Sequence, residues 1–218
     1  MIEVPVYNVA GDEVSKFSID EALLGGELRP ALLKQASVMY HANQRQGTSR
    51  TRSRAEIEGS TKKLYAQKHT GNARRGNIRT NVMKGGGNAF AKRPRDFRQE
   101  MPLKQRRLAR NNAILAKIKS NNLKILDALA VDAPRTKTVT AMLAALQADR
   151  SVLIATNGLD RNAYLSARNI PRVSILPAAQ MNAHDILTSR VLVITQPALE
   201  ELLKTISAPR HKEEAAAA

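Results

Sequence analysis

The sequence predicts an α/β protein, in which helices cover a mostly parallel β-sheet and one long, irregular basic loop is inserted into the body. Three observations predict this arrangement. Short apolar segments alternate with amphipathic ones from residue 108 onward, as in proteins whose parallel strands are joined by helices. Residues 47–107 sustain neither the helical nor the strand period of apolar residues. Residues 41–112 contain 19 Lys and Arg but only four acidic residues.

The composition excludes several classes of protein. The chain has 218 residues, 43% of them hydrophobic, so it can build a core and full-length disorder is not expected. It has no cysteine, which excludes a disulfide scaffold, thiolate zinc sites, iron–sulfur clusters and cysteine nucleophiles. No apolar run approaches the roughly 18–20 residues of a membrane helix. Residues 1–8 have the pattern of neither a signal peptide nor a transit peptide.

The N-terminal part predicts two strands and a helix. Residues 3–7 and 13–17 alternate apolar and polar side chains on either side of a turn at Ala10, Gly11 and Asp12. A helix is expected to begin at Pro30 and to reach the basic loop near Arg45. The apolar residues after this proline have helical spacing and are Leu32, Leu33, Ala36, Met39 and Tyr40.

The C-terminal part predicts a regular alternation of helices and strands. A second helix contains Leu108, Leu115 and Ile118. Further helices are expected at 138–148, 161–168, 182–187 and 197–206, the second of them with Asp160 as its N-cap. Strands are expected at 123–126, 151–155, 173–176 and 191–194. Because these strands are continuously apolar, they predict a Rossmann-like parallel sheet that is covered on both faces.

The domain organisation follows from the loop. Residues 1–46 and 101–208 are expected to form a single discontinuous α/β body, 47–100 an extended basic loop, and 209–218 a flexible tail. A compact domain rarely contains a structureless segment of this length, which favours a functional extension or a disordered insert. Outside residues 41–112 the chain is almost neutral, with 16 basic and 15 acidic residues. This asymmetry favours an arm that binds nucleic acid.

No residue pattern predicts catalysis, a cofactor or a metal. The glycine run at 85–87 does not follow a strand, and no G-x-G-x-x-G fingerprint is present. Residues 59–63 lack the second glycine of a phosphate-binding P-loop. His41, His69, His184 and His211 do not have metal-ligand spacing, and no G-x-S-x-G motif occurs. We therefore expect that the chain is not an enzyme and needs no cofactor.

The basic loop is expected to bind RNA. Its Lys and Arg residues are distributed along the loop and not confined to one helical face, which suits an irregular RNA fold better than a DNA groove. With aromatic residues at only 3% of the chain, an RNA-recognition sheet is not expected. Tyr65, Phe90 and Phe97 lie in the loop and could either stack on bases or pack the loop against itself.

Several stretches of the loop and the body closely resemble the bacterial type of the large-subunit ribosomal protein four family. In the loop they lie at 45–48, 54–57, 59–60, 62–63, 67–68, 70–71, 73–74, 85–86 and 90–94. In the body they are Ala-Pro-Arg-Thr-Lys at 133–137 and Ala-Arg-Asn at 167–169. The resemblance extends to about Leu203.

The resemblance implies a structural constituent of the large subunit, located on cytoplasmic ribosomes. It implies a Rossmann-like body on the subunit surface and an extension through large-subunit rRNA to the polypeptide exit tunnel, which supports subunit assembly. Its partners would be this rRNA and neighbouring ribosomal proteins, with no membrane and no DNA. The implied rRNA contacts are Arg45, Thr48, Arg50, Arg52, Arg54, Lys62, Lys63, Lys68, Arg74, Arg75, Arg79, Lys84, Lys92 and Arg93. The implied tunnel tip contains Leu64, Tyr65, Lys68 and His69.

The chain departs from the family pattern at this tip. Leu64 and Tyr65 stand where the family usually has Pro-Trp, Ala66 stands for an Arg, and His69 stands for a Gly. Two other functions stay open. One is a free RNA-binding regulator that represses its own operon through leader RNA, and the other is a nucleotide-binding α/β enzyme.

Overall fold

The computed structural model describes residues 1–129, 131, 133–148 and 150–207, so the tail predicted at 209–218 lies outside the described residues. The chain divides into two compact units. We call the unit formed by Met1–His41 and the residues from Glu100 onward the body, and the unit Ala42–Gln99 the arm. Each unit is described separately below.

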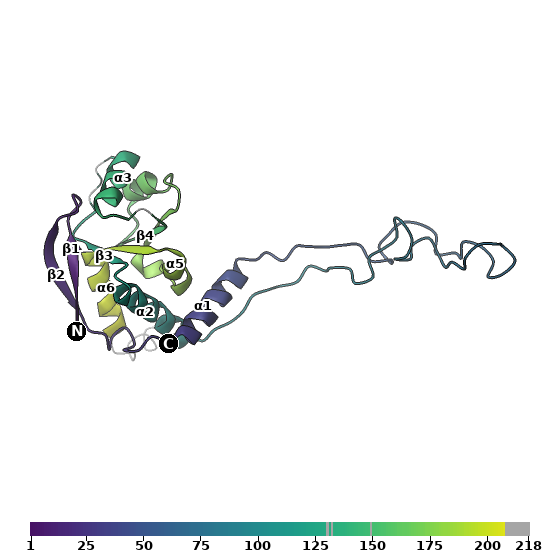
Figure 1. The fold of residues 1–218 in the computed structure, drawn as a ribbon, viewed down its shortest axis with the longest axis horizontal. Coiled ribbons are helices and arrows are strands. Elements are labelled where there is room, and N and C mark those ends of the chain that lie inside the picture. The colour runs from purple at the N-terminus through teal and green to yellow at the C-terminus, as the bar shows by residue number, and fades with distance from the viewer. Residues whose placement is uncertain (130, 132, 149, 208–218) are drawn as a thin grey trace, which may run out of the picture. The chain divides into compact units, whose positions relative to one another are not determined.

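The body contains a six-stranded sheet in the order β2-β1-β3-β6-β4-β5. Figure 1 shows this sheet among the helices of the body and labels β1, β2, β3 and β4. Only the β1–β2 pair is antiparallel, and every other neighbouring pair is parallel. The strands are β1 (Ile2–Tyr7), β2 (Glu13–Ile19), β3 (Leu123–Leu126), β4 (Val152–Thr156), β5 (Val173–Pro177) and β6 (Val191–Thr195). The mostly parallel α/β fold predicted from the sequence is therefore confirmed.

Helices cover both faces of this sheet. They are α1 (Pro30–Asn43), α2 (Leu103–Lys119), α3 (Thr136–Ala145), α4 (Arg161–Ala167), the short 3-10 helix η1 (Ala178–Gln180), α5 (Ala183–Thr188) and α6 (Gln196–Ser207). Buried residues of α1, α2, α5 and α6 belong to one hydrophobic cluster, and buried residues of α3 and α4 belong to a second cluster.

The strand β6 shows why the sheet needs two covered faces. Leu192 and Ile194 point into the first cluster, and Val191 and Val193 point into the second. Successive side chains of a strand point to opposite faces, so a strand that is apolar at every position must be buried on both sides. All five residues of β6 and all five of β4 are buried.

The predicted bounds of α3 differ from the observed ones. The helix begins at Thr136 and ends at Ala145, although the apolar spacing predicted an end at Ala148. Gln147 adopts a left-handed conformation with φ 53°. The backbone N–H groups of Gln147 and Ala148 donate to the carbonyls of Ala144 and Leu143, which is the Schellman pattern of a helix end. Leu146 and Ala148 lie beyond the end of the helix but are still buried. Their burial continued the apolar pattern of the helix in the sequence, so the predicted end was too late.

A buried asparagine holds the segment that precedes α1. Asn112 of α2 is fully buried. Its side-chain nitrogen donates to the carbonyl of Glu27 at 2.5 Å, and its oxygen accepts from the backbone N–H of Arg29 at 2.9 Å. Because both polar ends of the side chain are satisfied, Asn112 can lie in the core and fix the loop before Pro30.

Candidate nucleic-acid interface

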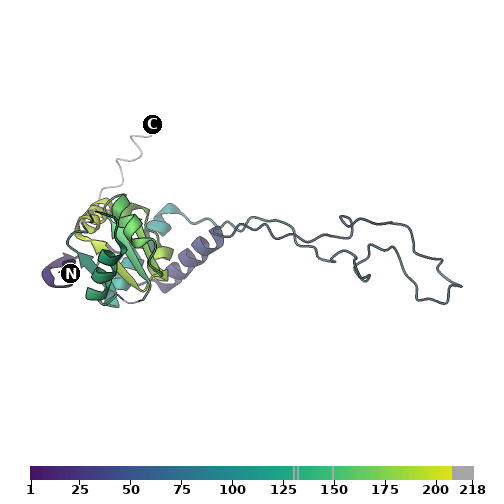
Figure 2. The same ribbon diagram turned by 90° about the horizontal axis from the view of Figure 1, so that it is seen from above.

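The arm is an extended loop whose two limbs lie side by side over part of their length (Figures 1 and 2). We call residues 43–63 the outgoing limb, 64–76 the tip and 77–99 the returning limb. Backbone hydrogen bonds join the limbs from Arg95 to Gly47 at 3.2 Å, from Thr51 to Lys92 at 3.0 Å, and from Asn88 to Arg52 at 3.0 Å. After α1, the arm contains no helix or strand among its residues, all of which are described.

The glycine run at 85–87 lets the backbone of the arm pack against itself. The N–H of Gly87 donates to the carbonyl of Arg79 at 3.1 Å. A Cβ atom on Gly87 would overlap the backbone nitrogen of Arg54, and a Cβ atom on Gly86 would overlap the carbonyl oxygen of Thr80. Only glycine permits such an approach between backbones. The run therefore has a packing role within the arm.

The tip is closed by its own hydrogen bonds. The N–H of Leu64 donates to the carbonyl of Gly76 at 3.0 Å. The Tyr65 hydroxyl donates to the carbonyl of Ala73. The Lys63 ammonium group, at the end of the outgoing limb, donates to Gln67 Oε1 at 2.7 Å and to the carbonyl of Arg75 at 3.0 Å. These contacts order the turn that carries Lys68 and His69, both of which are exposed.

The arm has 15 Lys and Arg residues but only three acids, Glu56, Glu58 and Asp96. Within its described residues there is one ion pair, between Arg50 and Glu56 at 2.7 Å. Among the residues that the structure describes, the other cations of the arm have no acidic partner within 4.0 Å. Their mutual repulsion is weakest when phosphates neutralise them, so the arm can bind a polyanion.

Four of these cations contact other groups of the arm, and one of them is Lys63, whose bonds at the tip are given above. The guanidinium groups of Arg45 and Arg95 stack on the Phe97 ring, at 4.1 Å and 4.3 Å from its centroid. Arg75 donates to the sulfur of Met83 at 3.5 Å. Among the described residues the following have no side-chain hydrogen bond, ion pair or ring contact: Arg52, Arg54, Lys62, Lys68, Arg74, Arg79, Lys84, Lys92, Arg93 and Arg98. All of them except Arg79 are exposed, so phosphate oxygens can reach them.

Glu56 is an acid with a local structural role in this basic unit. Its carboxylate accepts from the backbone N–H of Ser53 at 3.1 Å and from the guanidinium of Arg50 at 2.7 Å. The bond from Ser53, followed by the bond from Arg50, lowers the pKa of Glu56 below its ordinary value. Glu56 therefore orients the Arg50 side chain and fixes the turn at residues 53–56.

The structure places the residues that the sequence nominated in different settings. Arg45, Arg50, Lys63 and Arg75 bind other parts of the arm, while Thr48 and most remaining nominated cations are exposed. Arg95 and Arg98 were not nominated, although they belong to the same basic surface. Their positive charge could have identified them as RNA contacts. They were not included because they lie beyond residue 94, where the resemblance to the family in the loop ends.

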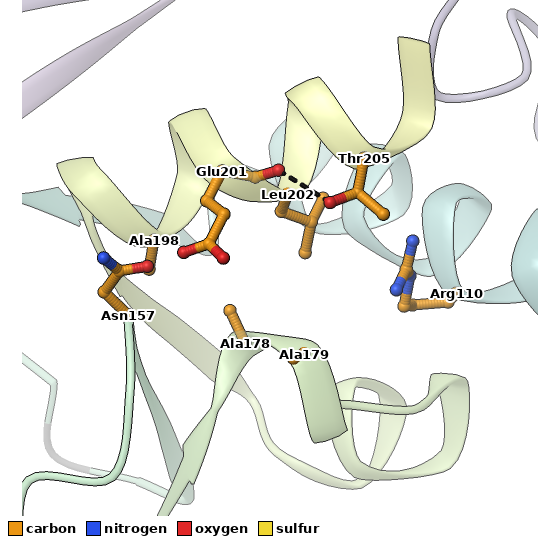
Figure 3. Close-up of a pocket in the computed structure, with 8 residues that line it drawn as sticks. All are labelled: Arg110, Asn157, Ala178, Ala179, Ala198, Glu201, Leu202 and Thr205. Atoms are coloured by element: carbon orange, nitrogen blue, oxygen red, sulfur yellow. Dashed lines mark hydrogen bonds between the residues drawn. The ribbon is translucent and has the colours of Figure 1, made fainter. Parts of the chain in front are cut away.

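The body has a small pocket of about 120 Å³ (Figure 3). Arg110 of α2 and Glu201 of α6 lie toward opposite ends of the pocket, and Ala178 and Ala179 of η1 face α6. Burial, and then the charge of Arg107, lowers the pKa of Arg110. The Thr205 hydroxyl donates to the Glu201 carbonyl at 2.9 Å, so it is not paired with a base. The lining offers no nucleophile–base pair for catalysis.

The described part of the chain contains no cluster of three or more His, Asp or Glu residues that could hold a metal ion. In the same residues, no helix is both long and apolar enough to cross a membrane.

The body and the arm together define a class of protein: an α/β domain with a long cationic insertion and no catalytic constellation among its described residues. Known proteins are similar in sequence to this chain along nearly its whole length. A sequence model of the family described as "Ribosomal protein L4/L1 family" matches residues 17–205. The chain therefore belongs to the ribosomal protein L4/L1 family, whose members are structural proteins and not enzymes.

Individual relatives carry the name "Large ribosomal subunit protein uL4". The protein from Dehalococcoides mccartyi is 43% identical over 201 residues, which cover 92% of this chain and 96% of the relative. The one from Symbiobacterium thermophilum is 42% identical over 202 residues, with coverage of 93% and 98%. The one from Brevibacillus brevis is 38% identical over 207 residues, with coverage of 95% and 100%. The family resemblance seen in the sequence is confirmed.

Proposed function

We propose that this chain is a structural component of the large subunit of cytoplasmic ribosomes and that its arm binds large-subunit rRNA. The observation that carries this proposal is the row of exposed cations along the arm, which have no acidic partners within the unit. The names of the relatives support the assignment to the large subunit. The partners are this rRNA and neighbouring ribosomal proteins.

The arm acts by electrostatic neutralisation. Arg and Lys side chains on two paired limbs present positive charge along the length of the arm, so it can lie between rRNA segments and reduce the repulsion of their phosphates. Arg side chains add bidentate bonds to phosphate oxygens. Because the limbs are hydrogen-bonded to each other, fewer backbone conformations are lost when RNA binds. The same neutralisation supports the assembly of the subunit.

The roles of individual residues are part of this proposal. The rRNA contacts are the fourteen residues nominated from the sequence, to which we add Arg95 and Arg98. Leu64, Tyr65, Lys68 and His69 form the end of the arm that reaches the polypeptide exit tunnel, as the family resemblance implies. The body supplies a docking surface for rRNA and neighbouring proteins.

The salt dependence of RNA binding tests the role of the arm. We expect the affinity of the full chain for purified large-subunit rRNA to fall steeply as salt rises, because each neutralised phosphate releases counterions. Replacing Arg52, Arg54, Lys92 and Arg93 with Gln should weaken binding and flatten the slope of log K against log salt. The matched control replaces four exposed cations of the body, Arg150, Arg161, Arg172 and Lys204, with Gln. Equal slopes in the two variants would contradict the proposal.

The assignment to the large subunit has a separate test. In a sucrose gradient of cell lysate, the chain should migrate with the large subunit and stay there as monovalent salt washes off loosely bound proteins. A chain that stays at the top of the gradient at low salt would favour a free regulator of RNA.

A further inference from the structure

The three aromatic residues of the arm are used in different ways. Phe97 is enclosed by the guanidinium groups of Arg45 and Arg95, and Tyr65 donates its hydroxyl to the carbonyl of Ala73. Both residues are partly buried. Phe90 is 98% exposed and has no ring contact with any described residue. Tyr65 and Phe97 therefore pack within the arm, whereas Phe90 is free to stack on RNA.

The pairing of the limbs explains why Phe90 is exposed. Asn88 donates to the carbonyl of Arg52 at 3.0 Å, and Thr51 donates to the carbonyl of Lys92 at 3.0 Å. The N–H of Lys92 also donates to the hydroxyl oxygen of Thr51 at 2.7 Å. Two adjacent residues of the outgoing limb thus anchor residues 88 and 92 of the returning limb. The three residues between these anchors have no partner on the facing limb and form a bulge with Phe90 at its centre.

The surroundings of this bulge are cationic. Arg52 and Lys92, which form the anchors, are exposed, and so is Arg93, which follows them. An apolar ring on a cationic surface fits a ligand that has both a π-face and a negative charge close by. A nucleotide whose base is unpaired has both, and stacking of a base on an aromatic side chain tolerates any sequence. A purely apolar protein partner would bury these charges without neutralising them.

We propose that Phe90 binds RNA by stacking on one unpaired base while Arg52, Lys92 and Arg93 hold the phosphates on either side. This inference rests on the proposed function and deepens it, because it specifies single-stranded nucleotides at this bulge. Helical RNA can satisfy the other cations of the arm, but its bases are already stacked on one another. Phe90 therefore distinguishes a looped-out base from a base pair.

The absence of tryptophan from the sequence allows a direct test. Phe90→Trp introduces a single tryptophan at the bulge, whose fluorescence can be excited selectively over that of tyrosine, and Phe97→Trp introduces one at the enclosed position as the matched control. Each full-length variant is titrated with a single-stranded oligoadenylate of about 12 nucleotides and with an RNA duplex of equal length. Binding is followed in parallel by the anisotropy of labelled RNA.

We expect oligoadenylate to quench the Phe90→Trp fluorescence strongly, the duplex to quench it little, and neither RNA to quench Phe97→Trp strongly. Phe90→Leu should weaken binding of the oligoadenylate by about tenfold and leave duplex binding unchanged. Because Phe90 is exposed, neither Phe90→Trp nor Phe90→Leu should destabilise the fold.

Two results would overturn the proposal. If both RNAs bind but quench Phe90→Trp equally or not at all, the ring does not stack on an unpaired base, although RNA binding by the arm stands. If the parent chain binds neither RNA, the proposed function fails and the role of Phe90 fails with it.

Discussion

His69 illustrates how a single residue can weaken the tip. Its backbone is left-handed with φ 64°, a conformation that costs most residues about 1–2 kcal/mol and costs glycine nothing. Related sequences are expected to have glycine at this position. The replacement of the family's glycine by His69 was the one signal of this strain in the sequence, and the left-handed conformation itself is seen in the structure.

Replacing this histidine with glycine should therefore stabilise the tip. We expect His69→Gly to slow hydrogen exchange of the Leu64 amide by roughly twofold to fivefold, because the relief of strain exceeds the added entropy of the unfolded chain. Native-state exchange measured by NMR checks this expectation. Lys68→Gly is the matched control, because Lys68 lies outside the left-handed region and should show the opposite change. Faster exchange in His69→Gly would contradict the strain argument.

Glu56 should make the turn of the outgoing limb sensitive to acid. Its pKa is lowered in the folded arm, so its bonds contribute fully at neutral pH and are lost as the pH falls through this lowered value. We expect the chemical shift of the Ser53 amide to titrate with a midpoint below the ordinary pKa of glutamate. Glu56→Gln should abolish this transition. A midpoint at or above the ordinary value would refute the assignment.

At the scale of elements, the apolar pattern of the sequence located every strand and every α-helix of the described residues, because burial imposes a characteristic spacing of apolar side chains on both. It was less accurate at ends that depend on hydrogen bonds and backbone conformation, such as the end of α3 at Gln147. It also missed η1, which is only three residues long. Arg110 and Lys117 of α2 are charged, which favours an exposed face of the helix, but both side chains are partly buried. The Lys117 ammonium group donates to the carbonyls of Ser189 and Arg190 at 2.5 and 3.0 Å.

The N-cap of α4 is an element boundary that the sequence predicted correctly. The carboxylate of Asp160 accepts from the backbone N–H groups of Asn162 and Ala163 at 2.9 and 3.2 Å. We expect Asp160→Ala to lower the free energy of unfolding of the body by about 0.5–2 kcal/mol. Asp160→Asn retains a side-chain acceptor and should cost less. Urea denaturation measures both, and equal losses in the two variants would show that the cap is not the cause.

At the scale of the whole molecule, the body contains the hydrophobic core and the arm does not. Every residue of the two hydrophobic clusters belongs to the body. The charge distribution along the sequence indicated that the arm has a separate role. Its pairing could not be predicted, because the bonds between the limbs are made by backbone groups and have no residue pattern of their own.

The body should therefore fold without the arm. We expect deletion of residues 47–98 to leave the free energy of unfolding of the body unchanged within about 0.5 kcal/mol, because no core residue is removed. The same deletion should prevent normal assembly of the large subunit and weaken binding to its rRNA. Chemical denaturation and sucrose gradients measure the two effects. Loss of a cooperative unfolding transition would show that the arm contributes to folding, and normal assembly would contradict the proposed function.

The hydrogen bonds between the limbs also constrain how this chain can change in length. Residues 47 and 51 of one limb are matched to residues 95 and 92 of the other, so one inserted residue shifts every partner beyond it. An insertion in one limb must therefore be compensated in the other, whereas the tip beyond the Leu64–Gly76 bond can lengthen on its own. Insertions and deletions among related genes should accordingly be concentrated at the tip or occur as matched pairs in the limbs.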